Sequence, residues 1–285
     1  MGSPAGQEFG AGDAREWIAV PGPDDDKYSR GVVGFVTGSA RYPGAAVLGV
    51  EAAMRTGVGM VRYLGPGRPT RLVLGRRPEA VTSDGRVQAW VLGSGQDATE
   101  RDDATADQLR TALAQDVPVV IDSGVLDLAG EAAGPAVLTP HAGELAKLLG
   151  VERSEISGDP ASSARRAADE HGATVLLKGH TSYVASPGGS LLRVTAPTTW
   201  LATAGSGDAL AGILGALIAT HATTIGGDAD ALAHLAGTAC VLHGAAGLRA
   251  SGVSAAGAAA GSRGGPFTVL ALCAELPAVV AELAG

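Results

Sequence analysis

The chain has 285 residues, of which 46% are hydrophobic and 4% aromatic, and its formal net charge is −8. This length is enough for one large α/β domain or two small ones. The acidic balance and the shortage of aromatic rings argue against nucleic acid and anionic membranes as partners, because both are bound through basic surfaces.

The two ends and the cysteines indicate where the protein works. Residues 1–13 are rich in glycine and lack the pattern of a secretory signal, so they are predicted to be a disordered leader before one domain at 14–285. No apolar run reaches the roughly 20 residues that span a bilayer. Cys240 and Cys273 lie in apolar stretches, which favours buried thiols over a disulfide. These features predict a cytoplasmic protein.

The first regular elements form a strand–helix–strand unit. Residues 32–36 are a β-branched run bounded by glycines, which predicts a buried strand. A loop leads into a predicted helix at 45–56, and a second strand follows at 60–64. Units of this kind build parallel sheets.

The same alternation continues along the chain. Strands are predicted at 87–92, 118–122, 136–140 and 174–178. Helices are predicted at 104–114, from the loop at 141–144 through residue 149, and at 161–171. An antiparallel hairpin is predicted at 182–186 and 191–194, followed by helices at 209–219, 230–248 and 269–283, the last broken at Pro277. The Gly-, Ala- and Ser-rich residues 251–265 are predicted to be a mobile loop. The fold class is therefore α/β, with a mostly parallel central sheet flanked by helices on both faces.

Glycines and polar side chains gather in the loops that follow the carboxyl ends of these strands. In open parallel sheets this edge is where ligands bind. The loops are residues 37–46, 93–96, 122, 141–144, 178–182 and 204–208.

The last of these loops, Gly205-Ser206-Gly207-Asp208, runs into an apolar helix. Unpaired amides at a helix start bind anions such as phosphate, and glycines let the backbone approach the ligand. A carboxylate at this place would repel the phosphate. Its presence is explained if Asp208 is the base that deprotonates a hydroxyl attacking a phosphoryl group. The alternative is that Asp208 only caps the helix.

Two further loops carry candidate ligand groups. Lys178 ends an apolar strand and is followed by Gly179, His180, Thr181 and Ser182, which suit the phosphates or ribose of a nucleotide. The alternative is that Lys178 is simply a solvated strand end.

His141 and Glu144 lie three residues apart after Pro140. They are read either as a capped helix start or as a substrate-binding histidine with a carboxylate that reaches Mg²⁺ through water. No H-E-x-x-H zinc pattern, P-loop or G-x-S-x-G motif is present. Residues 93–98 fit the dinucleotide pattern G-x-G-x-x-A, but they are read as a glycine turn at a strand end.

Taken in order, these motifs resemble the ADP- or ATP-dependent NAD(P)H-hydrate dehydratases, whose fold is ribokinase-like. The resemblance runs from about residue 14 to the C-terminus and rests on matching segments at 27–31, 37–39, 43–46, 139–144, 178–181 and 204–208. The Gly-Ser-Gly-Asp loop alone is shared with sugar and vitamin kinases of the same fold.

The resemblance implies repair of hydrated NADH or NADPH. Such enzymes phosphorylate the ring hydroxyl with a nucleotide, and loss of phosphate restores the dihydronicotinamide; with ADP the other product is AMP. Asp208 would be the base, and the amides of Gly205, Ser206 and Gly207 the anion hole. The nucleotide would be held by Lys178, Gly179, His180, Thr181, Ser182 and Gly207; the hydrate by Ala45, Gly95, His141 and Asp208; and Mg²⁺ indirectly by Glu144.

The chain also departs from the family pattern. Residues 122–125 read Asp-Ser-Gly-Val where relatives often carry a second Asp, and Ser94 and Ala142 stand where proline is common. The resemblance further implies a homo-oligomer and a separate NAD(P)H-hydrate epimerase, for which this chain is too short.

Two other hypotheses stand beside the dehydratase: a ribokinase-like kinase of a small alcohol or vitamin precursor, and a non-catalytic nucleotide-binding regulator.

Overall fold

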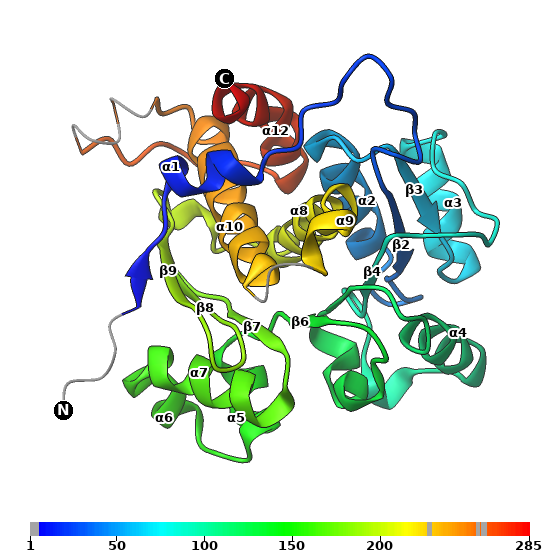
Figure 1. The fold of residues 1–285 in the computed structure, drawn as a ribbon, viewed down its shortest axis with the longest axis horizontal. Coiled ribbons are helices and arrows are strands. Elements are labelled where there is room, and N and C mark those ends of the chain that lie inside the picture. The colour runs from blue at the N-terminus through cyan, green and yellow to red at the C-terminus, as the bar shows by residue number, and fades with distance from the viewer. Residues whose placement is uncertain (1–5, 227–229, 255–256, 258–260) are drawn as a thin grey trace.

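The computed structural model describes residues 6–226, 230–254, 257 and 261–285. Its centre is a nine-stranded sheet in the order β1-β9-β8-β7-β6-β5-β4-β2-β3 (Figure 1). β8 alone runs antiparallel to its neighbours, so the prediction of a mostly parallel sheet is confirmed. The strands are β1 (Gln7–Glu8), β2 (Val32–Val36), β3 (Met60–Tyr63), β4 (Ala89–Leu92), β5 (Val119–Ile121), β6 (Ala136–Leu138), β7 (Thr174–Leu177), β8 (Thr181–Ala185) and β9 (Leu191–Thr195).

Helices cover both faces of the sheet, as the sequence predicts (Figure 1). On one face lie α2 (Gly44–Thr56), α8 (Ser206–Thr220), α10 (Ala231–Ala250) and α12 (Val269–Ala284). On the other lie α4 (Asp103–Leu113), α5 (Ala142–Leu149), α6 (Arg153–Gly158) and α7 (Pro160–His171). The shorter helices are α1 (Ala11–Ala14), α3 (Gly67–Arg76) and α9 (Ala222–Ile225), with 3-10 turns at Arg15–Trp17, Ala98–Glu100, Ser123–Glu131 and Thr199–Leu201.

The central strands are apolar along their whole length because helices bury both of their faces. In β2, Phe35 packs into the core beneath α2 and α8, and its neighbour Val36 packs into the core beneath α4. A strand of this kind reads as a continuous hydrophobic run instead of an alternating one. This is why the sequence identifies these strands so directly.

Two glycines let α2 and α8 pack unusually close. A Cβ placed on Gly212 of α8 would lie 2.2 Å from the backbone oxygen of Gly49 in α2. A Cβ on Gly49 would in turn lie 3.4 Å from the backbone oxygen of Asp208. The contact therefore brings the N-terminal ends of both helices to the same edge of the sheet.

Part of the predicted leader is ordered, which corrects the sequence analysis. Gln7 and Glu8 pair with Leu192 and Arg193 as strand β1, and Phe9 is only 3% exposed. Phe9 packs where α10 carries Gly237, on which a Cβ would lie 2.9 Å from the ring. The buried ring of Phe9 and the pairing of β1 with β9 order this segment, although its composition is typical of a disordered segment. Residues 1–5 lie outside the described residues.

Two predictions about the apolar helices are also corrected. α12 continues through Pro277 without a break, because Leu276 and Val279 on either side of it are buried. Proline in a helix interior costs about 3 kcal/mol, and this burial offsets it. The sequence analysis found no apolar run long enough to span a bilayer, whereas α10 is a 20-residue helix that could cross one by length and composition. In this fold 83% of its apolar window is buried inside the protein, as in a core helix.

Several short elements had no clear sequence signal. α3, α6 and the 3-10 segment Ser123–Glu131 were not predicted. The predicted mobile loop at 251–265 falls partly on residues 255–256 and 258–260, which lie outside the described residues. Cys240 and Cys273 are buried free thiols in α10 and α12, as predicted.

Candidate active site

The turn before α8 has a backbone that only glycine adopts easily. Gly205 has φ +89° and ψ −11°, and a Cβ there would lie 2.4 Å from Leu48 Cδ1. α8 begins directly after it, at Ser206, with no side chain capping its first turn. The Ser206 amide donates to the Thr203 carbonyl at 3.3 Å, whereas the amides of Gly207 and Asp208 have no partner among the described residues and are free to bind an anion.

Asp208 lies in this first turn but does not cap the helix. Gly205 occupies the N-cap position, and within the described part of the chain the Asp208 carboxylate accepts no hydrogen bond and forms no ion pair. Burial and the nearby charge of Asp122 raise the pKa of Asp208 to about 7, against the lowering effect of Lys178. A carboxylate that changes protonation near neutral pH is suited to general base catalysis.

Asp122 and Lys178 form a buried ion pair next to this turn. Lys178 Nζ donates to Asp122 Oδ1 at 2.7 Å, where Thr139 also donates at 2.8 Å, while Ser94 donates to Oδ2 at 2.8 Å. Burial opposes the charge of Asp122, but Lys178 and the two hydroxyls hold its pKa below the usual value. Burial likewise opposes the charge of Lys178, but Asp122 and the more distant Glu144 keep its pKa raised.

The strand ends on the other side of α8 form a second part of the site. β2 lies between β3 and β4, so the chain turns in opposite directions after β2 and after β4. In open α/β sheets, ligands bind at such a change of direction. Gly95, with φ +66°, approaches so close that a Cβ would lie 2.3 Å from the Cβ of Ala45 at the start of α2. Ala45 and Gly95, both predicted to contact the hydrate, are thus in contact with each other.

Two polar atoms at these strand ends lack partners. Thr37 Oγ1 and Gln96 Oε1 are buried and have no hydrogen-bond partner among the described residues. Buried polar groups are normally paired. Both atoms are therefore candidates to contact a bound ligand; the sequence analysis placed both residues in candidate ligand-binding loops, but gave neither a role of its own.

His141 and Glu144 form a capping box at the start of α5. The His141 Nδ1 accepts from the amides of Gly143 and Glu144 at 3.0 and 3.1 Å, and Glu144 Oε2 accepts from the His141 amide at 2.8 Å. The capped-helix interpretation is confirmed. Among the described residues no group of three or more His, Cys, Asp or Glu side chains could hold a metal ion. A direct Mg²⁺ cage made by these side chains is therefore absent, and a contact through water stays a prediction.

A cavity of about 710 Å³ lies between the antiparallel hairpin, α8 and α10. Its polar wall contains seven residues predicted from the sequence: His141, Lys178, Gly179, His180, Ser182, Ser206 and Gly207. Thr181 does not line the cavity, and its hydroxyl lies 3.2 Å from that of Thr195 across the hairpin. The volume and the cationic, amide-rich end suit a nucleotide.

His243 was not among the predicted site residues. It projects from α10 into the cavity, and its Nε2 lies 3.0 Å from the Ser206 hydroxyl. Burial lowers the pKa of His243 to about 4, so the ring is neutral and fixes Ser206 through a hydrogen bond. A lone histidine in an apolar helix gives no pattern from which this contact could be foreseen.

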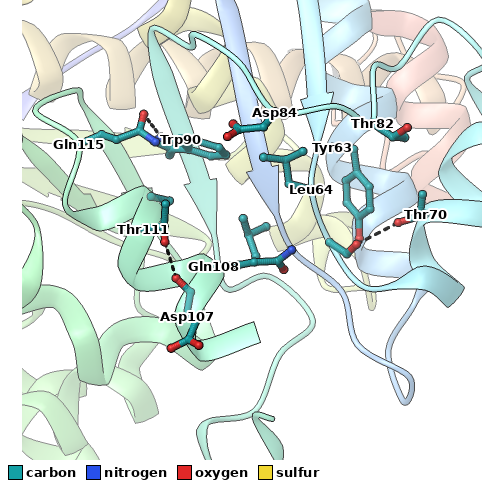
Figure 2. A pocket seen from close by; sticks show the side chains of 13 residues that line it. Tyr63, Leu64, Thr70, Thr82, Asp84, Trp90, Asp107, Gln108, Thr111 and Gln115 are labelled. Carbon is teal, nitrogen blue, oxygen red and sulfur yellow. Dashed lines mark hydrogen bonds between the residues drawn. The ribbon is translucent and has the colours of Figure 1, made fainter. Parts of the chain in front are cut away.

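A second cavity of about 380 Å³ lies on the opposite face of the sheet, beside α4 (Figure 2). Thr111 and Gln108 of α4 face Leu64 and the ring of Trp90 across it, and Trp90 Nε1 donates to Gln115 at 3.2 Å. None of the site residues predicted from the sequence lines this cavity. Seven of the predicted residues line the larger cavity, whereas Asp208, Gly205, Ala45, Gly95 and Glu144 line neither.

The sequence model of the NAD(P)H-hydrate dehydratase family matches residues 33–261 of the chain. The chain belongs to this family. A bifunctional NAD(P)H-hydrate repair enzyme of Mycobacterium tuberculosis is 45% identical to it over 224 residues, which are 74% of this chain and 46% of that protein. The chain thus spans about half the length of this relative. An ADP-dependent (S)-NAD(P)H-hydrate dehydratase of Xanthomonas campestris is 37% identical over 68% of this chain and 74% of its own.

A solved structure shares the fold over the full length. The ADP/ATP-dependent NAD(P)H-hydrate dehydratase of Bacillus subtilis, co-crystallised with ATP and Mg²⁺, superposes with a TM-score of 0.83 at 24% identity, covering 99% of this chain and 100% of that one. The ribokinase-like fold expected from the resemblance is confirmed. Members of the dehydratase family and kinases share this fold: a hydroxyethylthiazole kinase of Pyrococcus horikoshii also matches, with a TM-score of 0.59 and 18% identity over 95% of this chain and 92% of its own.

Proposed function

We propose that the chain dehydrates the (6S) hydrate of NADH or NADPH in a nucleotide-dependent reaction. The hydroxyl of the hydrated ring attacks the terminal phosphorus of ADP, and the bond from that phosphorus to AMP breaks. The ring then loses phosphate and a proton, which restores the dihydronicotinamide. Phosphorylation is needed because hydroxide is a poor leaving group.

Asp208 is the base in this proposal, and its environment is the observation that carries it. The carboxylate lies beside the unpaired amides of α8, has no partner of its own within the described residues, and has a pKa of about 7. It can take the proton of the attacking hydroxyl at neutral pH. The amides of Gly205, Ser206 and Gly207 then stabilise the charge that develops on the phosphoryl oxygens.

The nucleotide occupies the 710 Å³ cavity in this proposal. The Lys178 ammonium and the Gly207 amide meet the phosphates at the polar end, while Leu201, Leu210 and Val194 offer an apolar surface to the base. The hydrate lies over Ala45 and Gly95 next to Asp208, and His141 contacts it from the wall of the nucleotide cavity. Mg²⁺, bound mainly by the nucleotide phosphates with Glu144 reaching it through water, would neutralise phosphate charge.

Absorbance tests this function directly. Hydrated NADH lacks the near-ultraviolet absorption of NADH, so adding the protein with ADP is expected to restore that absorption, and omitting the nucleotide to prevent it. ATP in place of ADP measures the nucleotide preference. A flat signal with both nucleotides would contradict the proposal, and phosphorylation of a vitamin or sugar alcohol under the same conditions would favour the kinase.

The name of the Xanthomonas campestris relative specifies the (S) hydrate. We extend this stereochemistry to the present chain, so that the other epimer depends on an epimerase activity. Assembly into homo-oligomers belongs to the same proposal.

A further inference from the structure

Asp122 is the most firmly held carboxylate near the active site. It is 2% exposed, and both of its oxygens accept hydrogen bonds: Oδ1 from Lys178 and Thr139, and Oδ2 from Ser94. These donors come from the ends of three different strands, β4, β6 and β7. The carboxylate therefore has one fixed position behind the site.

Lys178 is held between this carboxylate and the anion-binding turn. Its amide donates to the Pro140 carbonyl at 2.9 Å, which fixes the backbone. Its Nζ is 2.7 Å from Asp122 Oδ1, and a Cβ on Gly207 would lie 3.6 Å from the same Nζ. The ammonium thus rests against the turn that is to receive phosphate, and it forms no ion pair with Asp208 among the described residues.

The titratable groups around Asp208 come from four places in the fold. Asp122 follows β5 and Lys178 follows β7, and these two charges oppose each other. Glu144 of α5 acts on Lys178, and His243 of α10 is neutral and bonded to Ser206. Because the buried pair is balanced, the cation does not fully compensate a charge on Asp208.

We propose that Asp122 is a positioning residue of this active site: it holds the Lys178 ammonium on the phosphate side and keeps it from neutralising Asp208. One cation then serves the nucleotide while the neighbouring acid keeps its affinity for a proton. This inference rests on the proposed function, in which Asp208 is the base.

The effects of Asp122 and Lys178 on the pKa of Asp208 have the directions that this geometry requires. After burial, Asp122 is the main cause that raises the pKa of Asp208, and Lys178 lowers it. Replacing Asp122 by a neutral residue removes the first effect and releases the ammonium to strengthen the second. Both changes make Asp208 more acidic and hence a weaker base.

The test is the titration of Asp208 in nucleotide-free protein, followed by carbon-13 NMR of its carboxyl group. In Asp122→Asn the pKa is expected to fall by about one or more from its value near 7. The acidic limb of the kcat/KM profile is expected to move to lower pH with it, and kcat to fall about tenfold because the base is weaker. The control is Ser94→Ala, which removes a hydrogen bond to Asp122 but leaves the Asp122–Lys178 ion pair. The pKa of Asp208 is therefore expected to be the same as in the wild type.

A second variant covers the case in which Asp122→Asn does not fold. Lys178→Met removes the cation that lowers the pKa of Asp208, so this pKa is expected to rise. An unchanged pKa in Asp122→Asn, or a fall in Lys178→Met, would overturn the inference. The titration needs no substrate, so a wild-type protein that fails to restore NADH would contradict the proposed function and still leave this inference tested.

Discussion

Asp208 faces two opposing requirements. It must lie close to a phosphoryl group, whose negative charge disfavours a carboxylate, and it must accept a proton from a hydroxyl. Burial and Asp122 satisfy the second requirement by raising its pKa to about 7. The free amides of α8 satisfy the first, because they bind the phosphate oxygens without help from the acid.

Substituting this residue separates catalysis from binding. Asp208→Asn is expected to lower turnover by at least about a hundredfold, since the amide cannot accept the proton. Nucleotide affinity should stay nearly unchanged because the turn amides and Lys178 remain. Turnover and calorimetric nucleotide binding, measured on the same preparation, check this expectation.

Asp103→Asn is the matched control, because Asp103 also lies in the first turn of a helix, α4, but away from the site. It should leave both properties as in the wild type. Equal turnover of Asp208→Asn and wild type would show that another group is the base.

Individual site residues differ in how far sequence reveals them. Asp208 and Lys178 stand next to glycines at strand or helix ends, a pattern that indicates ligand contact. The Asp122–Lys178 pair joins residues 56 positions apart, and the His243–Ser206 pair joins residues 37 apart. No local spacing records such contacts, so the sequence places Asp122, Lys178 and Ser206 near the site without showing how they pair. It gives no indication of His243.

The packing of α2 against α8 sets the distance between the two halves of the site. Ala45 and Asp208 lie in the first turns of the two helices, and the Gly49–Gly212 contact fixes how closely these helices approach. A side chain at this contact forces the helices apart. The helix pair is therefore both a packing unit and a spacer for the site.

Gly212→Ala tests this contact. The new Cβ would lie 2.2 Å from the backbone of Gly49, so the free energy of unfolding is expected to fall by about 1–3 kcal/mol. Denaturant unfolding measures the change. Gly75→Ala in α3 is the control, because its Cβ would meet no atom within 4 Å and alanine favours a helix. A stability equal to that of wild type in Gly212→Ala would contradict the close-contact account.

Elements are predictable where periodicity or composition is strong. The buried strands and long apolar helices are correct to within a few residues. β1 was not predicted because its order comes from tertiary contacts, namely its pairing with β9 and the packing of Phe9 against α10. The predicted break at Pro277 is wrong for the same reason: buried neighbours outweigh a local preference.

The whole molecule gathers loops from distant parts of the chain at one sheet edge. Strand–helix alternation predicts this edge from the sequence alone, since parallel strands all end on the same side. The sequence does not reveal the order of the strands, which places β2 between β3 and β4. The cavity between the hairpin and α10 likewise forms only when elements distant in the sequence pack together, so the sequence does not reveal it.

The central claim is that this edge transfers a phosphoryl group to the ring hydroxyl before that oxygen leaves. A hydrate prepared in oxygen-18 water carries the label in its ring hydroxyl, and mass spectrometry of the inorganic phosphate shows where the label goes. We expect one labelled oxygen in each phosphate, released in equal amount with AMP and restored NADH. Unlabelled phosphate, with the oxygen-18 found in water, would contradict the account.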